Sequence, residues 1–455
     1  MRLHDSLTPL VAALAVGLAA CAAPAADTTA ADMAAEDTMA PATMAVTLPT
    51  VSDEITGPGP MFNSAPSHDD TWNMEHYGYE EREYFISGTA NSQPYTARMV
   101  VRKPADDAAF SGLVLAESMH GSGSAHVFEY TSAYTMASGH AAVEITTTSP
   151  DQFVAMNPGR YADLEIGEGQ TNEILAQAGA LIKSGTGPMA GLTVRRMVLG
   201  GTSMSAGTLS NYLQDHAVYR TPDMGMIFDG YLPTSTGGTL REIDVPIVHI
   251  PTMHEVDDGL TTRADSDEPG RQYRMYVFPG MGHIDSRDNV RLQPNPCVNP
   301  LSGFPLQAYM AVGLDHLFRW VDQGVVPPRA DRVAVEGEGD ASGMALDGHG
   351  NPIGGIRNPY VDVPTASYTP VNTPADPPIA NPSAYVAARE GGAAQMCRLS
   401  AYQVDFPADQ LRELYGTPEA YVADVAAHLD AAEAAGWSLP MYREMILADA
   451  HAVAF

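Results

Sequence analysis

Lysine and long apolar runs are what this chain most nearly lacks. Only Lys103 and Lys183 are lysines among 455 residues, and 55 acidic residues outnumber 24 basic ones, which gives a formal charge of −31. A surface of this sign repels phosphates, so nucleic-acid binding is excluded. Cysteine is also scarce, at three residues, but a chain of this length buries a large core without needing disulfides or metals. Its 41 glycines and 35 prolines exclude a coiled coil and indicate many turns.

The apolar stretch at residues 7–20 follows Arg2 and is too short to span a bilayer as a helix. It ends in small residues directly before Cys21, which resembles the signal of a bacterial lipoprotein, in which cleavage precedes a cysteine that is then lipidated. An ordinary secretory signal that happens to contain a cysteine is the alternative. We expect a signal peptide at 1–20, lipidation of Cys21, and an exported protein anchored in the outer membrane, facing the periplasm or the cell surface.

Residues 21–54 are rich in Ala, Thr, Asp and Pro and contain no aromatic residue, which is typical of a disordered tether. Two cysteines remain after Cys21. In an oxidising compartment an even pair suggests a disulfide between Cys297 and Cys397, although two buried thiols are the other possibility.

Strand-like and helix-like segments alternate along the next part of the chain. We expect a hairpin over 82–90 and 95–103 with Asn91 and Ser92 in its turn, and further strands at 112–119, 141–148, 194–200, 224–230, 245–251 and 274–278. Helical patterns occupy 126–137, 172–183, 206–215, 306–323 and 407–450. This order predicts an α/β protein, with a mostly parallel central sheet flanked by helices. The core should span 55–328, and an irregular and helical extension at 329–455 should pack on it.

A strand that runs into a glycine-flanked serine and then into a helix marks the candidate nucleophile. The segment Gly201-Thr202-Ser203-Met204-Ser205 resembles the G-x-S-x-G nucleophile elbow of α/β-hydrolases, with Ser205 in place of the second glycine. We expect Ser203 to be the nucleophile and the backbone N–H of Met204 to face the oxyanion; Ser205 is the alternative nucleophile.

A second glycine-rich turn, His120-Gly121-Ser122-Gly123, follows the predicted strand 112–119 and resembles the H-G-G-G loop of esterases. Glycines let backbone N–H groups approach a carbonyl oxygen closely. We therefore expect Gly121 and Ser122 to contribute to an oxyanion hole together with Met204.

The acid and the base should follow the serine in the order acid, then histidine. Glu255 lies in the loop after the predicted strand 245–251, and Asp257 and Asp258 remain alternative acids because the register of the loop is open. His283 follows a strand and the turn Pro279-Gly280-Met281-Gly282, so we expect it to be the general base.

Further motifs resemble a secreted bacterial family of α/β-hydrolase domain proteins. The matching segments are 228–233, 265–267, Arg274, Cys297, 319–321, Gly324, 327–328, 347–351, 354–357, 360–364 and 397–400. The family carries a Ser-Gln-Ser elbow where this chain has Ser203-Met204-Ser205, which leaves a backbone donor in place. The resemblance implies an α/β-hydrolase fold and a Ser-acid-His triad, but no particular substrate.

Together these motifs predict a serine hydrolase that cleaves a small-molecule carboxylic ester through an acyl-enzyme, with Ser203, Glu255 and His283 as its triad. A non-catalytic binding lipoprotein on a hydrolase scaffold, and an acyltransferase using the same triad, are the alternatives. No cofactor or metal is implied, and contact with a membrane is expected only through the lipid anchor. Because a large lid is missing between 233 and 245, we expect the pocket to be shaped by 149–170 and by the extension. Phe153, Tyr161, Tyr360 and Tyr368 are the candidate lining aromatics from these two segments.

Overall fold

The computed structural model describes residues 42–65, 73–148, 151–261, 263–287, 289–337, 343–387 and 391–455, which belong to one compact unit. The predicted signal at 1–20, Cys21 and the first part of the predicted tether lie outside these residues. Within the described part of the chain, no helix combines the length and the apolar character that crossing a bilayer requires.

A central sheet organises the fold. Within the described residues it has nine strands in the order β11-β10-β9-β7-β5-β6-β4-β3-β2. The strands from β11 to β6 run parallel, and β4, β3 and β2 continue the sheet antiparallel. The bounds are β2 Thr50–Val51, β3 Tyr79–Ala90, β4 Gln93–Pro104, β5 Leu113–Ser118, β6 Ala141–Ile145, β7 Arg196–Thr202, β9 Gly230–Thr234, β10 Ile247–His249 and β11 Tyr273–Met275. The predicted α/β architecture is confirmed.

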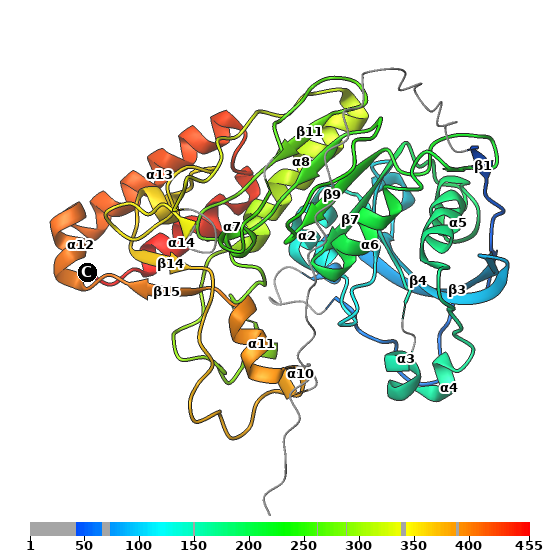
Figure 1. Cartoon of the computed structure of the whole chain (residues 1–455), viewed down its shortest axis with the longest axis horizontal. Helices are drawn as coiled ribbons and strands as arrows, with labels where there is room; N and C mark the ends of the chain where they lie inside the picture. The colour runs from blue at the N-terminus through cyan, green and yellow to red at the C-terminus, as the bar shows by residue number, and fades with distance from the viewer. Residues whose placement is uncertain are drawn as a thin grey trace, which may run out of the picture. The chain divides into compact units, whose positions relative to one another are not determined.

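The hairpin β3–β4 turns through Asn91 and Ser92, as predicted. Ala90 pairs with Gln93, and the two residues between them have φ values of 48° and 60°. Such positive φ values match the right-handed twist of the two strands, and asparagine tolerates them better than most residues do. This long hairpin forms the antiparallel side of the sheet, seen in blue in Figure 1.

Helices cover both faces of the sheet. Along β5, Leu113 and Leu115 point into the core that contains α2 and α8, whereas Val114 and Ala116 point into the core that contains α5. This alternation is what a strand buried on both faces requires. The helix bounds on this part of the chain are α1 Met74–Tyr77, α2 His126–Ala137, α3 Asp151–Met156, α4 Pro158–Tyr161, α5 Thr171–Lys183, α6 Met204–Tyr212, α7 Met253–Asp257 and α8 Leu306–Gln323.

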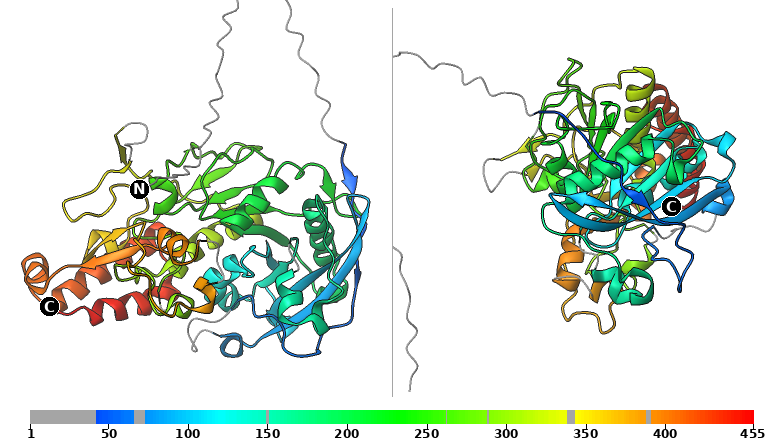
Figure 2. Two further views of the ribbon diagram at one scale, coloured as in Figure 1. Left: turned by 60° about the horizontal axis from the view of Figure 1, so that its bottom comes forward. Right: turned by 90° about the vertical axis from the view of Figure 1, so that its right-hand side faces the viewer.

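The C-terminal extension continues the core on the α2/α8 face. Tyr421, Val425, Leu429 and Ile446 are buried in the same apolar cluster as Leu317 of α8. Figure 2 shows the extension, in orange and red, on the side of the sheet away from the β3–β4 hairpin. Its helices are α9 Pro359–Asp362, α10 Ala384–Ala387, α11 Gly392–Leu399, α12 Ala408–Tyr415, α13 Pro418–Ala435 and α14 Arg443–Ala452.

Four short strands of the extension form two further pairs, and in one more pair a strand near the start of the described chain joins one from the middle of it. The three pairs are β12 Val335–Glu336 with β13 Gly343–Met344, β14 Ala366–Thr369 with β15 Tyr402–Asp405, and β1 Met44–Ala45 with β8 Tyr219–Arg220.

Two expectations are wrong. Residues 42–54 are not part of a tether, because β1 pairs with β8, β2 pairs with β3, and Val46 between them is buried. The low-complexity composition concealed these two edge pairings. The strand expected at 224–230 begins only at Gly230, because Ile227 and Phe228 before it pack into the core as side chains of a loop and make no ladder.

Candidate active site

A strained turn between β7 and α6 presents Ser203. This residue has φ 52° and ψ −114°, a backbone conformation that residues other than glycine rarely adopt. A Cβ on Gly201 would lie 2.5 Å from the carbonyl oxygen of Ser205 and 2.8 Å from the nitrogen of Ala206, so only glycine fits there. The turn therefore has the steric requirement of a nucleophile elbow.

Ser205 is buried and faces the backbone of the same turn. Its hydroxyl accepts the N–H of Thr202 at 2.8 Å and donates to the carbonyl of Thr202 at 2.9 Å. Both of these bonds stabilise the elbow. The hydroxyl of the alternative nucleophile is thus engaged by the backbone of Thr202, at a position where the common motif has glycine.

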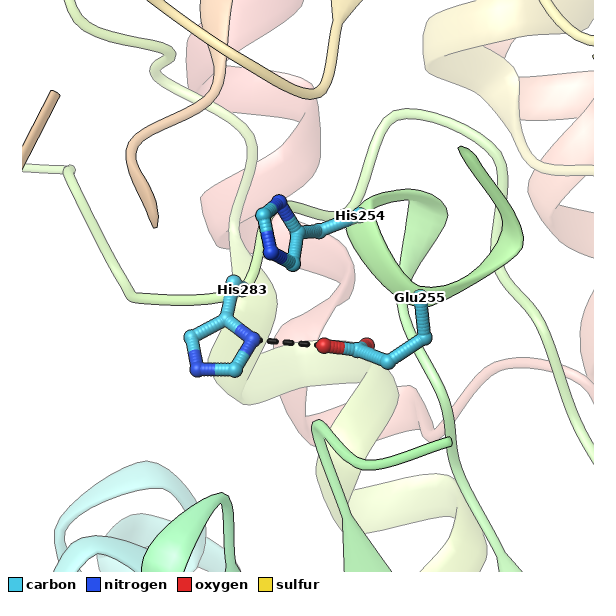
Figure 3. Close-up of side chains that lie close together, drawn as sticks. All are labelled: His254, Glu255 and His283. Atoms are coloured by element: carbon cyan, nitrogen blue, oxygen red, sulfur yellow. Dashed lines mark hydrogen bonds and ion pairs between the residues drawn. The ribbon is translucent and has the colours of Figure 1, made fainter. Parts of the chain in front are cut away.

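A hydrogen-bonded chain joins the predicted serine, histidine and acid. Ser203 Oγ lies 3.1 Å from His283 Nε2, and His283 Nδ1 lies 2.6 Å from Glu255 Oε1. Figure 3 shows Glu255 reaching His283 from α7, with His254 beside both. These hydrogen bonds join residues from three separate segments that follow the carboxyl ends of β7, β10 and β11.

Glu255 is fixed by its own helix terminus. Its second carboxylate oxygen accepts both the N–H and the hydroxyl of Thr252, each at 2.7 Å, which completes a capping box at the start of α7. Burial opposes the charged form, but the hydrogen bond and charge of His283 and the two bonds from Thr252 outweigh it and lower the pKa of Glu255 to about 2. The acid therefore stays ionised at neutral pH. The Thr-x-x-Glu spacing of Thr252 and Glu255 is the sequence signature of such a capping box.

The other carboxylates of the loop lie elsewhere. Asp257 and Asp258 are exposed, and Asp258 pairs with His254 at 3.3 Å and with Arg398 at 3.7 Å. His249 is held by the hydroxyl of Tyr273 and by a backbone carbonyl, and burial lowers its pKa to about 4.

The glycine turn after β11 carries His283 back towards the serine. Gly280 has φ 98°, and a Cβ there would lie 2.6 Å from the ring of Phe304. A Cβ on Gly282 would lie 2.7 Å from the Cβ of Ala401. A larger residue at either position would force this turn or its neighbour to shift.

The predicted oxyanion loop lies against the elbow. A Cβ on Gly121 would come within 2.5 Å of the methyl group of Met204. Within the described residues, neither the N–H of Gly121 nor that of Met204 has a hydrogen-bond acceptor. The N–H of Ser122, by contrast, donates to His120 Nδ1 at 3.0 Å. Of the three predicted backbone donors, Gly121 and Met204 are therefore available and Ser122 is already engaged.

Glu117, at the end of β5, closes this loop. Its two carboxyl oxygens accept the N–H groups of Val127 and Phe128 at 3.0 and 2.9 Å, in the first turn of α2. Burial raises the pKa of Glu117 to about 8 despite these two donors. The loop 119–125 is thus anchored at both ends by one buried side chain.

His254, Glu255 and His283 have side chains of the type that binds metals, and their ligand atoms lie within 4.8 Å of one another. Both oxygens of Glu255 already accept hydrogen bonds, one from His283 and one from Thr252. This arrangement orients an imidazole for proton transfer, whereas a metal would have to displace those bonds.

A cavity of about 1080 Å³ opens over Ser203, and two groups of residues from separate parts of the chain are among those that line it. His120, Ser122, His126 and Tyr130 come from the oxyanion loop and α2; Tyr385, Gln395, Met396, Arg398 and Leu399 come from α10 and α11. A disulfide between Cys297 and Cys397 ties α11 to the loop before α8, as predicted. The extension therefore forms one wall of the site.

The four aromatic residues expected to line the pocket, from 149–170 and from the extension, lie elsewhere, and no residue of 151–170 lines the cavity. Phe153 and Tyr161 are buried in a separate cluster with Met119. Tyr360 and Tyr368 line a second cavity, between α9 and α14. The lining aromatics are Tyr130 and Tyr385, which no local motif of the sequence marks.

Three esterases of known structure are among the proteins to which part of this chain is similar. A cold-adapted esterase from an Arctic intertidal metagenomic library is 15% identical, with a TM-score of 0.25, over 43% of this chain and 83% of that one. The esterase Est22 is 10% identical, with a TM-score of 0.29, over 40% and 66%. A thermostable esterase from Pseudomonas putida ECU1011 is 11% identical, with a TM-score of 0.26, over 38% and 64%. No curated protein matches the chain. The family model described as alpha/beta hydrolase domain matches residues 46–448, and the chain therefore belongs to the alpha/beta hydrolase domain family.

Proposed function

We propose that the protein is a serine esterase that cleaves a carboxylic ester through an acyl-enzyme on Ser203. The observation that carries this proposal is the continuous hydrogen-bonded chain from Ser203 through His283 to Glu255 beneath a cavity large enough for a small-molecule ester.

In the first half of the reaction, His283 Nε2 takes the proton of Ser203 as Oγ attacks the ester carbonyl carbon. The carbonyl oxygen becomes an oxyanion, and the N–H groups of Gly121 and Met204 are the donors for it. When the carbon–oxygen bond to the alcohol breaks, His283 returns the proton to the leaving oxygen. Glu255 stabilises the imidazolium between these two steps and keeps the proton of the neutral ring on Nδ1.

In the second half, water takes the place of the alcohol. His283 accepts one proton of the water while the water oxygen attacks the acyl carbon, and the same proton then returns to Ser203 as the carboxylic acid leaves. The proton count closes over the cycle, so no cofactor is required.

Hydrolysis of short-chain p-nitrophenyl esters by the purified protein tests the proposal. We expect Ser203→Ala to lower kcat to background, and Ser205→Ala, the matched control, to keep kcat within about tenfold because Ser205 only braces the turn. Unchanged activity in Ser203→Ala would contradict the proposal. Absence of activity in the wild type against a full panel of acyl and alcohol lengths would favour a binding protein on a hydrolase scaffold.

A further inference from the structure

A second serine–histidine–carboxylate chain lies at the same cavity, which its serine and histidine line. Ser122 Oγ lies 3.3 Å from His126 Nε2, and His126 Nδ1 lies 3.0 Å from Glu129 Oε2. His126 and Glu129 are each only 6% exposed. The groups follow the same order as in Ser203, His283 and Glu255, but all three lie on one loop and the first turn of α2.

The donors and acceptors of this chain can be assigned from its contacts. His126 Nδ1 faces the Glu129 carboxylate and therefore carries a proton, and Arg291 reaches the other oxygen of Glu129 at 3.4 Å. His120 Nδ1 accepts the N–H of Ser122, so it carries no proton. The hydroxyl of Ser122, 2.7 Å from that nitrogen, therefore donates to it in the free protein. Its oxygen is then the acceptor for Nε2–H, 3.3 Å away, of the His126 imidazolium that is paired with Glu129.

The rings around Ser122 are held in place by packing. His126 stacks on Tyr130 with ring centroids 5.4 Å apart and meets His120 edge-to-face at 4.8 Å. The hydroxyl thus has a fixed oxygen position and a proton that can be turned towards one acceptor or another. An oxyanion is a stronger acceptor than a neutral imidazole nitrogen.

We propose that the hydroxyl of Ser122 is a third donor to the oxyanion, and that His126 and Glu129 are positioning residues that hold its oxygen in place. Ser122 lines the cavity, and its neighbour Gly121 lies against Met204 of the elbow. Its backbone N–H, which was expected to donate to the oxyanion, already donates to His120. In this proposal the side-chain hydroxyl is the donor instead. The proton stays on Ser122 throughout, and no bond to Ser122 is formed or broken. This inference rests on the proposed esterase function.

Kinetics of variants at Ser122 test the proposal. Losing one oxyanion donor lowers kcat by about a hundredfold in hydrolases, so we expect Ser122→Ala to lower kcat by about that factor with KM changed less than about threefold. Its affinity for a trifluoromethyl ketone, which forms an oxyanion on Ser203, should fall by a similar factor. Ser122→Thr should restore most of both values. If Ser122→Ala folds poorly, Ser122→Cys takes its place in the test. A thiol is a weak donor of similar size, so we expect this variant to give a loss between those of the alanine and threonine variants.

The positioning role has its own readout. His126→Phe keeps an aromatic ring to stack on Tyr130 but removes the nitrogen next to Ser122. We expect it to lower kcat about tenfold alone, and to lower it no further when Ser122 is already alanine, because both changes act through one hydroxyl. A purely structural effect of His126 would add to the loss in the double variant.

Unchanged kcat and ketone affinity in Ser122→Ala, or additive losses in the double variant, would overturn this inference and leave the esterase proposal intact. So would an ester-derived or phosphonate adduct on Ser122 itself, which would make it a nucleophile. If the wild type neither hydrolyses esters nor forms an adduct on Ser203, the esterase proposal fails first.

Discussion

Replacing Glu255 by glutamine tests how the acid controls the histidine. One oxygen of the carboxylate accepts from His283 at 2.6 Å, and the other accepts two bonds from Thr252 at 2.7 Å. An amide has one oxygen, so it can satisfy only one of these two sides. Facing Thr252 keeps two hydrogen bonds and the cap of α7, which leaves the NH₂ group opposite His283.

That orientation reverses the histidine tautomer. An NH₂ donor at Nδ1 requires an unprotonated Nδ1, so the proton of the neutral ring moves to Nε2, which can then no longer accept the proton of Ser203. In hydrolases, a wrong tautomer of this kind lowers kcat by about 10³- to 10⁴-fold, or about 4–5.5 kcal/mol in activation free energy. We expect a loss of this size with little change in KM.

The assay is steady-state hydrolysis of a p-nitrophenyl ester, with Asp257→Asn as the matched control from the same helix. Asp257 is exposed, so its variant should keep full activity. Near-ultraviolet circular dichroism would verify that both variants are folded. The reasoning is refuted if Glu255→Gln keeps more than about a tenth of wild-type kcat, or if Asp257→Asn shows the larger loss.

Three further results are expected. Gly201→Ala should destabilise the protein by about 2–4 kcal/mol and abolish ester hydrolysis, because its Cβ would lie 2.5 Å from a backbone oxygen that cannot move; a thermal melt and activity like those of the wild type would contradict this. Cys297→Ser together with Cys397→Ser should lower the free energy of unfolding by about 2–5 kcal/mol and raise KM, because the bond closes a loop of 100 residues and fixes the wall of the cavity. Denaturant unfolding and kinetics measure the two effects, and unchanged KM would contradict a role of α11 in substrate binding. Glu255 should stabilise the fold above about pH 4.5 and lose that effect as the pH falls towards 2, because its pKa is lowered on folding. The stability difference from Glu255→Gln should therefore shrink by up to about 3 kcal/mol over that range, and a constant difference would speak against the lowered pKa.

Local motifs singled out Ser203, Glu255 and His283, which the structure brings together, because the geometry of each turn depends on short-range constraints. The strand, glycine and serine at the elbow are adjacent in sequence, and so are the glycines before His283. Their spacing in the chain carries the geometry directly. The hairpin at Asn91 and Ser92 was predictable for the same reason.

Contacts between distant segments were beyond such motifs. The wall formed by α11 depends on the link between Cys297 and Cys397, 100 residues apart, and on where the extension packs. The engagement of the Ser122 N–H by His120 depends on a ring orientation that no spacing encodes. Residues 42–54 found strand partners far along the chain, which their composition did not indicate.

The most direct test of the central claim is covalent trapping of the nucleophile. The intact protein would be treated with a fluorophosphonate, its mass measured, and the modified residue identified from peptides. We predict one adduct per chain, on Ser203, which is absent from Ser203→Ala and retained by Ser205→Ala. No adduct on the folded wild type, or an adduct on Ser205, would contradict the assignment of Ser203 as the nucleophile.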